Sequence, residues 1–289
     1  MESIREIYKI GNGPSSSHTM GPKKAASVFS GQHPEAVSFL VHLYGSLALT
    51  GKGHLTDKAI VDAFMPRPVE IAWHPDQVLP LHTNGMTFLS RNEEGRTTGE
   101  WTTYSIGGGD ISDTGKREES ENVYPLSTMK EILAYCEENG LTFWEFVEMH
   151  EAPDLKKYLA EVWKSMQETL ARGLEAEGVF HGGLHLQRKA RSFYLKAKNF
   201  NRNVNRRPLT YAYALATSEE NAAGGIVVTA PTCGSCGVLP AVLFLAKTLE
   251  KASDLQIIRA LETAGLVGAL IKKHASVAGA EVGCQGEVG

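Results

Sequence analysis

Residues 152–178, which read APDLKKYLAEVWKSMQETLARGLEAEG, decide how the chain is divided. Their apolar residues recur at the spacing of an amphipathic helix, and the stretch ends at a glycine. Residues 127–140, STMKEILAYCEENG, show the same pattern. After residue 150 only the run GIVVTAP, residues 225–231, is typical of a strand. We therefore predict a mainly α-helical C-terminal domain over residues 151–289.

The chain before this helical region has a different pattern. Residues 36–45, AVSFLVHLYG, alternate as a half-buried strand does, and the apolar face holds Val37, Phe39, Val41 and Leu43. Residues 86–106, MTFLSRNEEGRTTGEWTTYSI, predict two short strands joined around a Glu-Gly turn. PKKAASVF, residues 22–29, and TDKAIVDAF, residues 56–64, have short helical patterns. Together these elements predict an α+β N-terminal domain over residues 1–150.

Composition and charge narrow the class of protein. The chain has 289 residues, of which 42% are hydrophobic and 21% are charged, values typical of a globular protein. The net charge of −4 gives no electrostatic basis for binding nucleic acid or an anionic membrane. The N-terminal sequence lacks the pattern of a signal peptide, and no stretch approaches the ~20 apolar residues of a spanning helix. We expect a cytoplasmic protein without nucleic-acid or membrane partners.

Four cysteines are too few for a disulfide scaffold in a chain of this size. Cys136 lies in a predicted amphipathic helix, where we expect it to be a small buried side chain. Cys233 and Cys236 form a C-x-x-C pair between an apolar run and a helix. This pair fits a thiol-redox motif, part of a metal site completed by Cys284, or two small residues packed in a glycine-rich turn.

Two N-terminal segments place polar residues just before a helix. They are GNGPSSSHTMGPKKAA, residues 11–26, and GSLALTGKGHLTDKAIVDA, residues 45–63. A helix start offers unpaired backbone N–H groups that bind anions such as a carboxylate. His18 and His54 add side chains that exchange protons near neutral pH, and Lys52 adds positive charge. The alternative for both segments is ordinary helix capping and structural histidines.

Two further turns contain small or polar residues. His82 and Asn84 lie in LHTNGMTF, residues 81–88, and three consecutive glycines occupy positions 107–109. These residues can line a site or can simply form tight turns. Composition alone favours the turns.

Long motifs spread over nearly the whole chain carry a resemblance to a known family. In the first half they are GPSSSHTMGP, LYGSLALTGKGHLTDKAI, HTNGM and YSIGGG, and in the second half NAAGGIVVTAPT, GVLPAVL and GAEVGCQGEVG. With these motifs the chain resembles the iron–sulfur-dependent L-serine dehydratases of the single-chain bacterial type. The resemblance implies an α+β domain joined to a helical domain that carries most of a cluster site.

The resemblance also implies a chemistry that uses no pyridoxal phosphate. In this family a [4Fe–4S] cluster with one open iron acts as a Lewis acid on L-serine, and a base removes the Cα proton. The products are pyruvate and ammonia. Carried over to this sequence, His54 is the first candidate for proton transfer and His18 the second. The expected substrate-binding residues are Ser16, Ser17, Thr19, Lys52, Thr56 and Asn84.

Cys284 matches the cysteine of the family's G-C-Q-G-E motif, which is a cluster ligand. The family's other two ligands come from a later segment that this sequence does not contain, and Cys233 departs from the usual family pattern. We therefore expect a C-terminally truncated serine dehydratase and, by resemblance, a homodimer. Two alternatives are a non-catalytic serine-binding fragment and, less favoured, a thiol oxidoreductase that uses Cys233 and Cys236.

Overall fold

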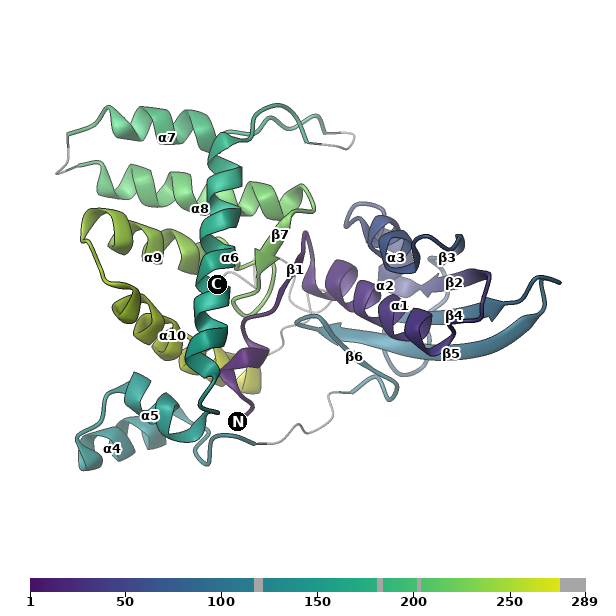
Figure 1. Ribbon diagram of the computed structural model, residues 1–289, viewed down its shortest axis with the longest axis horizontal. Helices are drawn as coiled ribbons and strands as arrows, with labels where there is room; N and C mark the ends of the chain where they lie inside the picture. Colours follow the sequence, from purple (N-terminus) through teal and green to yellow (C-terminus); the bar gives the residue numbers. More distant parts are fainter. Residues whose placement is uncertain (117–121, 181–183, 202–203, 276–289) are drawn as a thin grey trace. The chain divides into compact units, whose positions relative to one another are not determined.

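The computed structural model describes residues 1–116, 122–180, 184–201 and 204–275 (Figure 1). These residues form two compact units. The N-terminal unit comprises residues 12–116. The helical unit comprises residues 1–11 together with the described residues from 122 to 275.

The N-terminal unit is built on a five-stranded sheet with the order β3-β2-β4-β5-β6. The strands are β2 (Ser38–Tyr44), β3 (Val69–His74), β4 (Gly85–Arg91), β5 (Thr97–Gly107) and β6 (Asp110–Ser112). β2 and β3 are parallel, and the connection between them contains α2 (Gly45–Thr50) and α3 (Thr56–Phe64). All other neighbouring strands are antiparallel.

One face of this sheet is covered by helices and forms the core of the unit. α1 (Gly21–Gln32) and α3 pack against each other and against the strands (Figure 1). Phe29 of α1 and Phe64 of α3 meet Phe39 and Phe88 of the sheet in one fully buried cluster. The alternating pattern of β2 therefore places its apolar residues beneath the two helices.

The helical unit consists mainly of helices of eight to 21 residues. They are α4 (Met129–Asn139), α5 (Phe143–His150), α6 (Leu155–Glu175), α7 (Ala190–Lys198), α8 (Arg206–Ala222), α9 (Val238–Leu249) and α10 (Asp254–His274). A short sheet pairs β1 (Ile10–Asn12) with β7 (Ile226–Val228). Capping boxes begin α4, α5 and α10, which explains where these helices start.

The apolar stripe of α6 forms the centre of this unit. Leu155, Leu159, Val162 and Met166 follow at three- and four-residue spacing and are all buried. Farther along, α6 crosses α8 so closely that a Cβ on Gly173 would lie 2.2 Å from the carbonyl oxygen of Ala216. A glycine is therefore needed at this crossing.

The first eleven residues pack into the helical unit, where they contact α10 at two glycines. A Cβ on Gly265 would lie 2.9 Å from the Cβ of Ile4, and one on Gly268 would lie 2.8 Å from the Cγ2 of Ile7. Ile4 and Ile7 are almost completely buried in the core cluster. Because Gly265 and Gly268 have no side chains, α10 has space at these two positions, and the N-terminal segment fills it.

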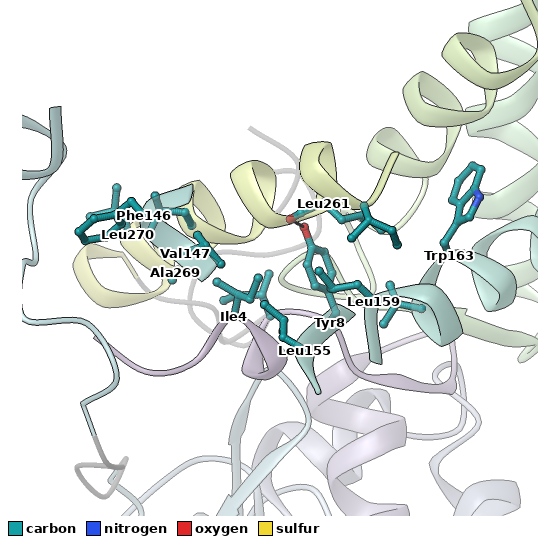
Figure 2. Packing of buried hydrophobic residues seen from close by; sticks show 14 of the residues in the cluster. Ile4, Tyr8, Phe146, Val147, Leu155, Leu159, Trp163, Leu261, Ala269 and Leu270 are labelled. Carbon is teal, nitrogen blue, oxygen red and sulfur yellow. Dashed lines mark hydrogen bonds between the residues drawn. The ribbon is translucent and has the colours of Figure 1, made fainter. Parts of the chain in front are cut away.

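Polar contacts hold the same segment in place. The Tyr8 hydroxyl donates to the carbonyl of Leu261 at 2.8 Å, and Figure 2 shows this ring directed toward α10. The N-terminal ammonium of Met1 donates to the carbonyl of Tyr124 at 2.8 Å. Sequence periodicity does not reveal this docking, because the partners lie more than 120 positions apart.

The fold class expected from the sequence is confirmed: an α+β region precedes a mainly helical one. The predicted strands and helices form, with one exception on the strand face. Val37 precedes β2 and is 40% exposed, whereas Phe39, Val41 and Leu43 are buried. Among the described residues, no helix is both long and apolar enough to cross a membrane.

The described residues from 122 onward belong to the helical unit, whereas the sequence analysis places the change near residue 150. The reason is that α4 and α5 contribute to the helical core. Ile132, Cys136 and Phe146 are buried in the same cluster as the α6 stripe. Cys136 is thus the small buried side chain that its helical pattern predicts.

Replacing Gly173 by alanine should lower the free energy of unfolding by about 2–3 kcal/mol, because the new Cβ collides with the backbone of α8. Denaturation followed by circular dichroism measures this change. Gly31→Ala in α1 is the matched control, since nothing lies within 4 Å of the added Cβ. The control should be neutral or stabilising by about 0.5–1 kcal/mol. Equal losses in both variants would contradict the packing argument.

Candidate functional site

The serine-rich segment of the N-terminal unit forms one buried turn. Ser16–Met20 adopt a single turn of π-helix directly before α1. Ser15 caps this turn, because its hydroxyl accepts a hydrogen bond from the backbone N–H of His18 at 3.1 Å. All five residues of the turn are buried. Short π-helical turns occur often at functional sites.

Two reciprocal hydrogen bonds join this turn to the loop before α3. The Thr19 hydroxyl donates to the carbonyl of His54 at 2.7 Å. The Thr56 hydroxyl donates to the carbonyl of His18 at 2.5 Å. We call this pair of bonds the threonine clasp. It fixes the backbone at both histidines, and it uses the donor hydrogens of two hydroxyls that the sequence analysis assigns to substrate.

The clasp brings the two predicted proton-transfer residues together. The ring centroids of His18 and His54 lie 4.7 Å apart. His54 is partly exposed, and its Nδ1 lies 3.0 Å from the carbonyl of Thr50. Because a carbonyl only accepts, Nδ1 carries a proton and the neutral ring has its lone pair on Nε2. His54 therefore presents Nε2 as the atom that can take up a proton.

His18 has a different environment, with a hydroxyl near each ring nitrogen. Its Nδ1 lies 3.0 Å from the Ser17 hydroxyl and its Nε2 lies 3.1 Å from the Ser46 hydroxyl. The residue is only 4% exposed. Burial, followed by the nearby His54, lowers the pKa of His18 to about 4. His18 is thus neutral at pH 7 and acts as a fixed polar group rather than a cation.

A third segment approaches the turn from strand β5. The Ser105 hydroxyl donates to the carbonyl of Ser17 at 2.6 Å, and Asn84 donates through Nδ2 to the carbonyl of Ser105 at 3.1 Å. A Cβ on Gly21 would lie 2.2 Å from the Ser105 Oγ, so the start of α1 must be glycine to allow this approach. The segments at Ser16–Thr19, Asn84 and Ser105 therefore converge.

Two buried polar atoms in this region lack a partner among the described residues. They are the Oγ of Ser16 and the Oδ1 of Asn84, and both residues are about 1% exposed or less. Buried polar atoms are nearly always hydrogen-bonded. A polar ligand in this region can complete the hydrogen bonding of these two atoms.

The sequence analysis expects unpaired backbone N–H groups at the two helix starts, but several of these groups already have partners in the structure. The backbone N–H groups of Thr19 and Met20 donate to the Ser15 carbonyl, and that of Thr56 donates to the Gly51 carbonyl. The N–H of His54 is likewise bonded within its own loop. These groups are not open to an anion, because the tight turns that precede both helices already use them.

Lys52 lies on the outside of its loop. The side chain is exposed, and its Nζ lies 5.5 Å from the centroid of the Trp73 ring. This cation–π contact holds the Lys52 ammonium over the Trp73 ring. Its expected support of substrate charge stays a prediction.

The sequence analysis missed Ser46 and Ser105. Ser46 follows the end of β2, where Gly45 has a φ of +49° and a Cβ would lie 2.5 Å from the carbonyl oxygen of Thr83. The Gly-Ser pair at a strand end was the available signal. Ser105 sits within β5, and nothing in its local pattern distinguishes it from other strand residues.

In the helical unit, Cys233 and Cys236 occupy the turn before α9. Both residues are 1% exposed. A thiol oxidoreductase needs an accessible thiolate, so their burial disfavours that alternative. Within the described residues, no three His, Cys, Asp or Glu side chains are arranged to hold a metal ion. The predicted ligand Cys284 lies outside the described residues.

The clasp should contribute measurably to stability. Thr56→Val removes the donor and leaves the buried carbonyl of His18 unpaired, so the free energy of unfolding should fall by about 1–3 kcal/mol. Thr19→Val should have a similar effect at His54. Urea denaturation measures both. Thr97→Val, at an exposed position of β5, is the control and should change stability by less than about 0.5 kcal/mol.

His18 should make stability depend on pH. Its folded-state pKa of about 4 lies below the ordinary value of 6.5, so the unfolded chain binds more protons between these values. Stability should therefore fall as the pH drops from 6.5 toward 4, with a slope from His18 of up to about 1.4 kcal/mol per pH unit. Denaturation at several pH values should show a shallower slope for His18→Gln. Parallel curves for the two proteins would contradict the assignment.

Two family models and several curated relatives match the chain. Residues 3–67 match the family model described as "Serine dehydratase beta chain", and residues 84–289 match "Serine dehydratase alpha chain". The L-serine dehydratase of Haemophilus influenzae and L-serine dehydratase 1 of Escherichia coli are each 37% identical to this chain, and the alignments cover 100% of it and 76% of each relative. The L-serine dehydratase of Streptomyces coelicolor is 34% identical over 99% of this chain and 75% of its own length.

Proposed function

Because the chain belongs to the serine dehydratase family, we propose that it is an L-serine ammonia-lyase whose proton-transfer site is the histidine pair of the N-terminal unit. The reaction removes the Cα proton and the β-hydroxyl of L-serine, which leaves as water. The resulting aminoacrylate tautomerises and is hydrolysed to pyruvate and ammonia. The observation that carries this proposal is the pairing of His18 and His54 by the threonine clasp.

His54 is the base in this proposal. The carbonyl of Thr50 holds the proton on Nδ1, so the neutral ring has its lone pair on Nε2 and can accept a proton there. Partial exposure lets the ring reach a bound molecule and pass its proton on. His18 stays neutral and orients the site through the hydroxyls of Ser17 and Ser46.

Ser16 and Asn84 are the proposed substrate contacts. The Ser16 hydroxyl can donate to the carboxylate of L-serine, and the Asn84 Oδ1 can accept from its ammonium group. Their buried, unpartnered atoms support this assignment. Thr19 and Thr56 act instead through the backbone, because their donor hydrogens are already used in the clasp.

The family resemblance adds an iron–sulfur cluster to the proposal, with Cys284 as a ligand. Such a cluster, when bound, supplies a Lewis acid that makes the substrate hydroxyl a better leaving group. The described residues do not supply a ligand set by themselves, because no three of their His, Cys, Asp and Glu side chains are arranged to hold a metal ion. The homodimer stays a prediction, which the mass from light scattering would check.

The decisive test combines catalysis and metal content in one sample. Pyruvate formation from L-serine by protein prepared without oxygen would support the proposal, and about four irons per chain in the same sample would support the cluster. Binding of L-serine without iron or turnover would instead favour the non-catalytic serine-binding fragment. If the protein neither binds L-serine nor converts it, the proposal is contradicted.

His54→Gln tests the base. It should lower kcat by about 10²–10⁴-fold, because the proton acceptor is lost, while calorimetry should show that L-serine still binds. His33→Gln is the control, since His33 lies at the opposite end of α1 from the buried turn, about 18 Å along the helix. An unchanged kcat in His54→Gln would remove His54 from the mechanism.

A further inference from the structure

A separate polar cavity of about 230 Å³ lies within the helical unit. It is bounded by α5, the connection from α5 to α6, and one side of α10. Its charged lining groups are Glu148, Glu151, Glu262 and Lys156. The histidine site belongs to the other unit, so this cavity is a distinct feature of the chain.

Glu262 is the unusual member of this lining. It lies on α10 and is 0% exposed, yet neither of its carboxylate oxygens has a hydrogen-bond partner among the described residues. A buried carboxylate without a partner is costly, and such a group in a native protein calls for a counter-charge, a donor or a proton. Burial, followed by the charge of Glu148, raises the pKa of Glu262 to about 7.

The other carboxylates of the lining already have partners. Glu151 accepts from the Tyr124 hydroxyl at 2.6 Å, from the backbone N–H of Ile4 at 2.8 Å and from the Ser3 hydroxyl at 2.7 Å. Glu148 forms an ion pair with Lys156 at 2.7 Å. Glu262 is therefore the acceptor that the cavity leaves open.

The charge of the lining favours a cation. Three carboxylates face one lysine ammonium around the cavity. Arg259 also faces Glu262 and opposes the rise of its pKa, but its guanidinium is stacked at 3.8 Å over the Trp144 ring and is not part of the lining. The lining thus carries an excess of negative charge that its own groups do not neutralise.

The geometry distinguishes between kinds of cation. No three acidic, His or Cys side chains of the described residues are arranged as metal ligands. An ammonium group instead donates up to three directional hydrogen bonds, which suits a carboxylate with both oxygens open. The cavity also exceeds the roughly 30 Å³ occupied by one water, so it has room for a ligand with a carbon skeleton.

We propose that this cavity binds a small organic molecule through its primary ammonium group, which donates hydrogen bonds to Glu262 and receives additional attraction from Glu148. The inference concerns the helical unit alone and does not rest on the proposed function.

Methylammonium and tetramethylammonium are matched probes, because they carry the same charge and only the first has N–H donors. At pH 8, where Glu262 is ionised, methylammonium chloride should raise the melting temperature of the full chain by about 2–4 °C more than tetramethylammonium chloride at equal concentration. Potassium chloride at the same concentration should match the tetramethylammonium salt. The difference should shrink at pH 6, because protonated Glu262 no longer attracts a cation.

Glu262→Gln should abolish the difference between the two probes. Glu168→Gln, which removes an exposed carboxylate from α6, is the control and should retain it. If Glu262→Gln does not fold, Glu148→Gln carries the test, and it should reduce the difference at least twofold. Equal shifts with both probes, an equal shift with potassium, or a full difference in either cavity variant would overturn the proposal.

Discussion

The helical unit depends on the contact between the first eleven residues and α10. Gly265 and Gly268 leave a gap on that helix, and Ile4 and Ile7 fill it with almost completely buried side chains. Without this segment the apolar faces of α6 and α10 would remain partly open to water, at a cost that grows with exposed apolar area. The segment also supplies the Ser3 and Ile4 donors that bind the Glu151 carboxylate. The same eleven residues therefore contact both the apolar core and the lining of the polar cavity. A part of the chain that precedes the N-terminal unit in sequence thus completes the other unit.

In the N-terminal unit, the comparable constraint is polar. The threonine clasp joins two loops whose histidines lie 36 positions apart, and each bond supplies a donor to the backbone carbonyl of one histidine. Once the backbone is fixed, the two rings experience different surroundings. His18 is buried and neutral, whereas His54 is partly exposed and its Nδ1 lies against the carbonyl of Thr50. Two residues of the same type therefore differ in chemistry because of burial and of the partners at each ring nitrogen.

Both units also hold buried polar atoms without partners, and these atoms have a common physical meaning. Ser16 and Asn84 lie beside the histidine pair, and Glu262 lies in the cavity of the helical unit. Folding alone does not favour such atoms, since an apolar residue of similar shape would avoid the loss of hydration. A bound ligand that restores the missing hydrogen bonds removes this cost. These atoms are the groups to which the proposed ligands of each unit would bind.

Local patterns in the sequence determined the α+β and helical regions and the two histidine loops. These features depend on residues within a few positions of one another, so periodicity and motif spacing reveal them. The tertiary structure alone decided which partner each residue meets. It assigned the hydroxyls of Thr19 and Thr56 to backbone carbonyls, brought Ser105 to the buried turn, and buried Glu262 in a helix where its charge suggests a surface position. The physical reason is that a sequence pattern identifies the face of an element that is buried, whereas the groups it is buried against come from distant parts of the chain.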